Sequence, residues 1–250
     1  MARRSISLFL LLVAVFPALN SPQAAKEPAE FVFARLIYSD ARGLSGFGWR
    51  GSWATDYPEA DYKFMYGIQR LSNIRVQIEE NPVEIMDPEL FKYPFVYAVE
   101  VGRMHISNTE AARLREYLLR GGFLYVDDFW GVYQYQNFAA QMKKIFPERP
   151  IEQIPLTHEI FRTFFTIDHV MQIPNISNGC RGGRTWQDAS DITPRVFGIN
   201  DERGRLMVLA TYNSDLGDAW EWMDEPCYPE LYSGQAYRMG LNFIIYAMTH

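Results

Sequence analysis

Two adjacent carboxylates at the end of an apolar run are the clearest candidates for chemistry in this chain. Asp127 and Asp128 follow the apolar residues of RGGFLYVDDFWG, and Trp130 comes shortly after them. Carboxylates placed together can hold a divalent cation or divide acid and base work between them. They can equally cap a turn by accepting backbone N–H groups. The sequence leaves both interpretations open.

Polar and aromatic residues also follow other apolar runs. In an open parallel sheet, ligands bind outside the carboxyl ends of the strands, so residues that follow different strands are predicted to share one rim. Asn213 and Asp215 follow the apolar run LMVLATY, and His158 comes from the loop-like segment PLTHEIF. The candidate ligand-binding residues are Asp40, Trp49, Trp53, Asp127, Asp128, Trp130, His158, Asn213, Asp215 and Glu221.

A subset of these residues is predicted to bind a metal ion. The candidate ligands are Asp127, Asp128, His158 and Asp215. A set rich in carboxylate oxygens favours calcium, magnesium or manganese over zinc. The segment NSDLGD contains part of a calcium-binding loop, but the full spacing with its terminal glutamate is missing. A divalent cation is therefore the only cofactor that the sequence suggests.

Nucleophilic catalysis has little support. A serine or cysteine nucleophile on a strand-to-helix turn needs a pattern such as Gly-x-Ser-x-Gly. After FLYV that position holds Asp127 and Asp128. The two cysteines, Cys180 in NGCRGG and Cys227 in EPCYPE, lie in loop-like segments. In an oxidising compartment they can form a disulfide, and two free thiols are the alternative.

Alternating strands and helices must position the candidate residues. The runs FVFARLIY, FVYAVEV, FLYV, RVFGIN and LMVLATY are predicted strands. The best-marked helix has a capping box at Ser107 and Glu110 and ends at a pair of glycines. An earlier helix is predicted to begin with Asp56 as its N-cap. This alternation predicts a single three-layer α/β domain with a mainly parallel sheet and helices on both faces.

The first 25 residues are predicted to be a signal peptide. Arg3 and Arg4 precede an apolar core at 6–16, and small residues follow it up to Ala25. The apolar run is shorter than the roughly 20 residues that a membrane span needs. Residues 26–250 are therefore expected to form a soluble periplasmic or secreted domain without a membrane span. An uncleaved N-terminal anchor is the lesser alternative.

The composition excludes several classes of protein. Hydrophobic residues make up 48% of the 250 residues and charged residues 22%, which is typical of a folded globular protein. The net charge of −6 argues against binding to nucleic acid. Aromatic residues, at 15%, are numerous enough to supply a binding surface as well as a core.

Several segments together resemble one exported bacterial family of unknown function. They are FVFARLIY, TDYPEADYKF, DPELFKYPFVYAVEVG, LREYLLRGGFLYVDDFWG, THEIF and YNSDLGDAWEW. The family is often encoded beside MoxR-type ATPases and von Willebrand A proteins. The resemblance implies a flavodoxin-like fold of the class I glutamine amidotransferase type, related to trehalose-utilisation proteins. The amidotransferase cysteine is missing from this sequence, so that activity is not implied.

Two functions remain after these exclusions. The favoured prediction is a non-catalytic binding module with an acidic, aromatic-rich pocket at the carboxyl ends of the strands. Its ligand would be a protein of the cell envelope or a carbohydrate. The alternative is a metal-assisted hydrolase or carbohydrate-active enzyme that uses Asp127, Asp128, His158 and Asp215.

Overall fold

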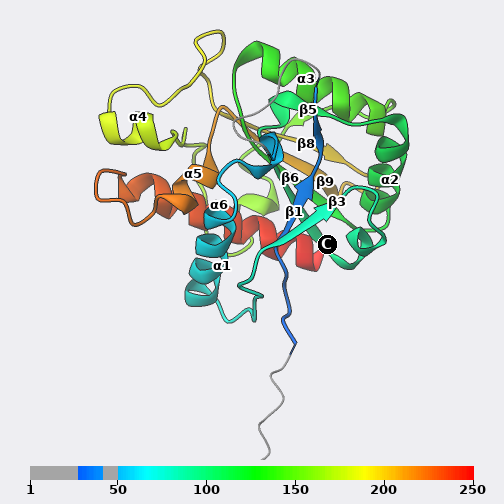
Figure 1. Ribbon diagram of the computed structural model, residues 1–250, viewed down its shortest axis with the longest axis horizontal. Coiled ribbons are helices and arrows are strands. Elements are labelled where there is room, and N and C mark those ends of the chain that lie inside the picture. The colour runs from blue at the N-terminus through cyan, green and yellow to red at the C-terminus, as the bar shows by residue number, and fades with distance from the viewer. Residues whose placement is uncertain (1–27, 42–49) are drawn as a thin grey trace, which may run out of the picture.

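A seven-stranded sheet forms the centre of the protein. The computed structural model describes residues 28–41 and 50–250, and it orders the sheet β3-β1-β4-β6-β9-β8-β7 (Figure 1). The strands of this sheet are β1 (Ala34–Ile37), β3 (Asn81–Glu84), β4 (Phe95–Val99), β6 (Phe123–Phe129), β7 (Glu152–Gln153), β8 (Arg195–Asn200) and β9 (Leu206–Tyr212). Two further strands, β2 (Ser39–Asp40) and β5 (Met104–His105), pair with each other in antiparallel orientation.

The sheet is mainly parallel, as predicted. Strands β3, β1, β4, β6 and β9 pair in parallel, whereas β8 runs antiparallel to β9, and β7 antiparallel to β8. Numbered along the chain, the parallel strands have the order 2-1-3-4-5 of flavodoxin-like sheets. The chain passes from β1 to β3 on one side and then to β4 on the other side. This reversal places a topological switch point between β1 and β4.

Helices cover both faces of the sheet and complete a three-layer α/β architecture. One face carries α1 (Glu59–Leu71), α5 (Leu216–Glu221) and α6 (Glu230–Thr249), and the other carries α2 (Asn108–Leu119) and α3 (Gly131–Ile145) (Figure 1). A short helix, α4 (Ile176–Arg181), lies in the long connection between β7 and β8. The 3-10 turns are η1 (Ser52–Ala54), η2 (Pro88–Lys92), η3 (Val101–Arg103) and η4 (Glu159–Phe161).

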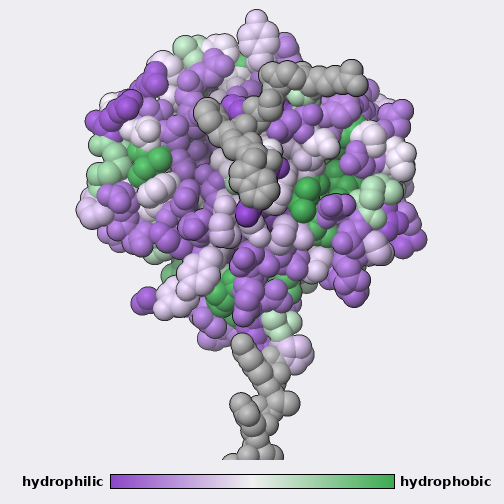
Figure 2. Space-filling view, viewed as in Figure 1, coloured by the Kyte–Doolittle hydropathy of each residue, from purple (hydrophilic) through white to green (hydrophobic). Residues whose placement is uncertain are grey.

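The central strand β4 shows why the run FVYAVEV is apolar throughout. Phe95, Tyr97 and Val99 face the core beneath α1, α5 and α6. Val96 and Ala98 alternate with them and face the core beneath α2 and α3. A strand covered on both faces has no polar side, so its sequence has no polar alternation. The surface outside these cores is mainly hydrophilic in the view of Figure 2, with small separate apolar patches.

Local signals predicted one helix start well and another less well. Ser107 and Glu110 form the expected capping box at the start of α2, and Gly121 follows the helix with a φ of 108°. Helix α1 begins at Glu59, later than predicted, because Asp56 adopts a left-handed φ of 60°. The Asp56 side chain consequently does not cap the helix.

No helix within residues 28–41 and 50–250 is long and apolar enough to cross a membrane. The predicted signal peptide, residues 1–25, lies outside the described residues.

Candidate functional site

Four residues at the carboxyl edge of the sheet share an unusual backbone conformation. Asp56, Glu100, Asp128 and Asn213 have φ values of 60°, 53°, 51° and 56°. Residues with a Cβ rarely adopt this left-handed conformation, and such residues cluster at functional sites. Asp56, Glu100 and Asn213 lie in the segments that follow β1, β4 and β9, and Asp128 lies near the end of β6, where its pairing with β9 is irregular. The strain therefore gathers at the edge where an α/β sheet binds ligands.

Three carboxylates converge at this edge to form a cluster that we call the acidic trio. One carboxylate oxygen from each of Asp56, Asp218 and Glu221 lies within 4.8 Å of the other two. Asp218 and Glu221 are one helical turn apart on α5, so both project from the same side of that helix. Asp56 Oδ2 is buried and has no hydrogen-bond partner within the part of the chain that the structure describes.

The backbone around the trio is shaped for this convergence. A Cβ at Gly217 would lie 2.6 Å from Asp56 Oδ2, so only glycine lets α5 approach this closely. Arg35, buried on β1, bonds to the Asp61 carboxylate and donates to the carbonyl oxygen of Thr55 at 2.8 Å. Arg35 thus fixes the segment that ends at Asp56 against the first strand and α1.

Positive charges compensate the trio only in part. Burial raises the pKa of Asp56 well above its usual value, and the charges of Asp218, Asp128 and Glu221 act in the same direction. Burial and then the charge of Asp218 raise the pKa of Glu221 to about 7. Arg35 lowers the pKa of Asp56 and Lys63 lowers the pKa of Glu221, but neither reverses the shift. Among the described residues, no lysine or arginine forms an ion pair with a trio carboxylate. Protons or a bound cation can balance the charge that remains.

A second carboxylate pair, Asp128 and Asp215, lies beside the trio. Asp128 Oδ1 accepts a hydrogen bond from Trp130 Nε1 at 2.6 Å. Gln187 Nε2 lies 3.4 Å from both Asp128 Oδ1 and Asp215 Oδ2, and so bridges the pair. Burial raises the pKa of each carboxyl, and the charge of Asp128 adds to the shift of Asp215. The Trp130 indole is itself buried and serves to hold Asp128.

Asp127 has a different role from its neighbour. Its Oδ2 accepts hydrogen bonds from the backbone N–H groups of Leu216 and Gly217 at 2.8 and 3.0 Å. Its Oδ1 accepts from Thr211 Oγ1 at 2.6 Å. Burial raises the pKa of Asp127 to about 6, although these hydrogen bonds act against the shift. Asp127 therefore anchors the start of α5 and has no oxygen left for a ligand.

The Asn213 side chain forms hydrogen bonds to the segments around the site. Its Oδ1 accepts from the N–H of Gly131 at 2.9 Å, at the start of α3. Its Nδ2 donates to the carbonyl oxygens of Asp191 and Thr193, both at 3.0 Å. All polar atoms of the side chain are thus used within the protein, so Asn213 positions the site and does not face a ligand.

The loop after β1 supplies the remaining candidates. Both carboxylate oxygens of Asp40 lie 3.2 Å from the N–H of Ser52, which donates to them. The Trp53 ring packs against Tyr57, with 5.5 Å between the ring centres. Both side chains order the segment that leads to Asp56. Trp49 lies outside the described residues.

We call the edge that carries the acidic trio and the Asp128–Asp215 pair the acidic edge. His158 is not part of this edge. It begins η4, where its Nδ1 accepts from the N–H of Ile160, and its ring lies 5.9 Å from that of Tyr246. Tyr246 is near the end of α6. Tyr228 lies just before the start of α6 and donates a hydrogen bond to the carbonyl oxygen of Pro174, close to the site. A helix of 20 residues is about 30 Å long, so the two regions are far apart. The predicted grouping of His158 with the aspartates does not form.

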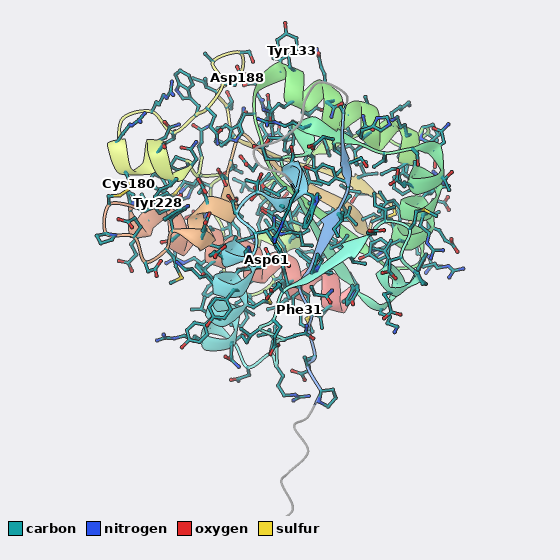
Figure 3. All side chains as sticks on the ribbon, viewed as in Figure 1. Phe31, Asp61, Tyr133, Cys180, Asp188 and Tyr228 are labelled. Carbon is teal, nitrogen blue, oxygen red and sulfur yellow. A yellow bond between two sulfur atoms is a disulfide. The ribbon has the colours of Figure 1, made fainter. Side chains whose placement is uncertain are left out.

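A disulfide secures the loop that closes the site. Cys180 and Cys227 are bonded, at a sequence separation of 47. We call residues 174–193 the strap. Figure 3 shows Cys180 beside Tyr228 at one end of the strap, and Asp188 near Tyr133 of α3 at the other. Between these ends Gln187 reaches the carboxylate pair, so the strap spans the acidic edge.

The sequence places Glu221 among the candidate residues, and it places Asp218 in NSDLGD, a segment that resembles both a turn and part of a calcium-binding loop. It predicts Asp56 only as a helix cap, and it gives no signal for Gln187. The available signal was the Asp218 and Glu221 spacing of one helical turn directly after Gly217. Nothing in the sequence near Asp56 indicates that its side chain meets α5.

The comparisons with known proteins identify a family and leave the activity open. No curated protein matches the chain. A family model described as Domain of unknown function (DUF4159) matches residues 32–248, which span all seven strands of the central sheet and the acidic edge. The protein therefore belongs to the DUF4159 family.

Proposed function

We propose that the protein is an exported, non-catalytic binding module whose acidic edge holds a divalent cation. The observation that carries this proposal is the convergence of three carboxylates within 4.8 Å, one of them with a buried oxygen that has no hydrogen-bond partner. Calcium–oxygen distances of about 2.3–2.6 Å separate opposite ligands by about 5 Å, which matches this spacing. Ligands that are all oxygens favour calcium, magnesium or manganese.

Export is supported by two independent features. The N-terminal sequence has the charge, apolar core and small residues of a signal peptide. The Cys180–Cys227 disulfide is of the kind that persists in the periplasm or outside the cell. A partner protein of the cell envelope or a carbohydrate would then meet the cation at the acidic edge.

Calorimetric titration of the full chain with calcium, magnesium and manganese tests the cation site. At least one ion should bind, and Asp218→Asn and Glu221→Gln should each weaken binding by about tenfold or more, because each removes a charged ligand. Asp168→Asn, an exposed carboxylate outside the site, is the matched control. If none of the three ions binds, or if both trio variants bind as well as the parent protein, the carboxylates share protons and the proposal is wrong.

Metal-assisted hydrolysis is the second candidate. The four left-handed residues favour it, because backbone strain of this kind is concentrated at active sites. A cation bound by the trio would lower the pKa of a coordinated water, with Asp128 and Asp215 beside it. Turnover of p-nitrophenyl esters, phosphates or glycosides that depends on the added ion and is lost in Glu221→Gln would support an enzyme. Ion binding without turnover would support the binding module.

A further inference from the structure

A groove between α1 and α6 lies apart from the acidic edge. Its volume is about 890 Å³, within the range of small-ligand sites. Its walls come from the second half of α1, the first half of α6 and the segment that joins α5 to α6. We propose that this groove binds a neutral oligosaccharide. The site does not include any residue of the acidic trio.

Two tyrosines are exposed along α1: Tyr66 lines the groove, and Tyr62 lies one helical turn earlier, beside it. Tyr62 and Tyr66 stack on each other, with ring centres 6.3 Å apart and an angle of 14° between the planes. They remain 50% and 47% exposed. The Arg70 guanidinium continues the stack at 5.9 Å from the Tyr66 ring centre. The exposed parts of these rings are apolar surfaces against which the C–H faces of pyranose rings can pack.

Two glycines within helices shape the groove. A Cβ at Gly67 would lie 2.1 Å from the Tyr237 ring, so Gly67 lets that ring pack directly on α1 and form the floor. At Gly234 of α6, no atom lies within 4 Å of where a Cβ would be. Glycine destabilises a helix interior by about 1 kcal/mol relative to alanine, and packing gives no reason for it at Gly234. The residue leaves room in the groove that a ligand can fill.

The polar groups of the groove favour a hydroxyl-rich ligand. Arg70 and Arg238 line it and make no ion pair within the described part of the chain. Asp224, Glu225 and Glu230 also line it, and Asp224 pairs with Lys63. Lys63, which lies outside the lining, balances Asp224, so the groove's two guanidinium groups stand against Glu225 and Glu230, which suits a neutral ligand. An apolar helix would bury these charges at a cost, whereas sugar hydroxyls can donate to the carboxylates and accept from the guanidinium groups.

Titration of the full chain with cellohexaose, maltohexaose and chitohexaose, followed by calorimetry, tests this site. At least one should bind, and Tyr66→Ala and Gly234→Leu should each weaken binding by about tenfold. Gly234→Leu fills the groove, and its melting temperature should stay the same or rise, because leucine has the higher helix propensity. Tyr133→Ala is the matched control, since Tyr133 is 79% exposed on α3, outside the groove.

Several results would contradict the oligosaccharide proposal. If none of the three oligosaccharides binds, or if Tyr66→Ala and Gly234→Leu bind like the parent protein, the proposal is wrong. It is also wrong if Tyr133→Ala weakens binding as much as they do, or if an amphipathic helical peptide binds the groove in place of the sugars. Tyr66→Ala and Gly234→Leu should leave cation binding unchanged, so a failure here is distinguishable from a failure of the cation site.

Discussion

At the scale of single residues, Asp127 and Asp128 show how adjacent carboxylates acquire different roles. Successive side chains of a strand point to opposite faces, so the two carboxylates meet different surroundings. Asp127 accepts hydrogen bonds from the N–H groups at the start of α5, and these bonds occupy its carboxylate. Asp128 takes a left-handed φ of 51° and joins Asp215 beside the acidic trio. A pair that looks like one site in the sequence is thus divided between scaffold and site.

Replacement of Asp127 by alanine should destabilise the fold. The change leaves the buried N–H groups of Leu216 and Gly217 without an acceptor, at an expected cost of about 3 kcal/mol in the free energy of unfolding. Urea denaturation measures this loss. Asp127→Asn, which keeps one acceptor oxygen, should lose less. Full stability of Asp127→Ala combined with loss of cation binding would instead identify Asp127 as a ligand.

At the scale of elements, the strap connects parts of the fold that the sheet alone does not join. Tyr228 donates to the carbonyl oxygen of Pro174 at 2.7 Å, and its ring would lie 2.6 Å from a Cβ at Gly179. The N–H of Ile176 donates to Asp218 Oδ2 at 2.7 Å. Strap, trio and the start of α6 therefore form one connected unit, which the disulfide closes.

Reduction of the disulfide should loosen this unit. A bond that closes a loop of 47 residues stabilises by about 4 kcal/mol in the chain-entropy model. Cys180→Ser with Cys227→Ser, or treatment with a dithiol reductant, should lower the melting temperature measured by circular dichroism. The cation affinity should also fall, because Asp218 loses its fixed neighbours. The double variant treated with reductant is the control, since it should show no further change. An unchanged melting temperature would contradict the structural role of the bond.

At the scale of the whole molecule, the fold concentrates negative charge where it is least solvated. The net charge of −6 is modest, yet Asp56, Asp128, Asp215, Asp218 and Glu221 share one edge. Burial raises the pKa of all five carboxyls above their usual values. The folded protein therefore binds protons that the unfolded chain releases.

The cation-free protein should become less stable as the pH rises from about 5 to about 7. Raised pKa values mean that stability is fully present below the unfolded-state pKa and is lost as the pH passes the folded-state values of about 6 for Asp127 and about 7 for Glu221. Each such proton contributes a slope of about 1.4 kcal/mol per pH unit. The lowered pKa of His158 acts in the opposite direction, but it is a single group.

Urea titrations at a series of pH values measure this slope. The variant Asp218→Asn with Glu221→Gln should flatten it, because two of the raised carboxyls are removed. Added calcium should restore stability mainly at the higher pH, where the carboxylates are free to bind it. A stability that increases steadily between pH 5 and pH 7 without any cation would contradict the electrostatic description of the edge.

The sequence by itself determined the layers and the general place of the site. The apolar run of β4, the capping box at Ser107 and the alternation of strands with helices all follow from local patterns that the tertiary structure preserves. The position of a ligand site at the carboxyl edge follows from the same pattern, because parallel strands end together.

Only the tertiary structure decided which carboxylates meet. Asp56 joins Asp218 and Glu221 across more than 160 positions of sequence, through a left-handed turn and the absence of a side chain at Gly217. His158, predicted at the same rim from a loop-like segment, instead packs at the far end of α6. The spacing of apolar residues indicates which face of its own helix or strand a residue occupies. Convergence depends on how loops from different elements pack together, and no local pattern carries that information.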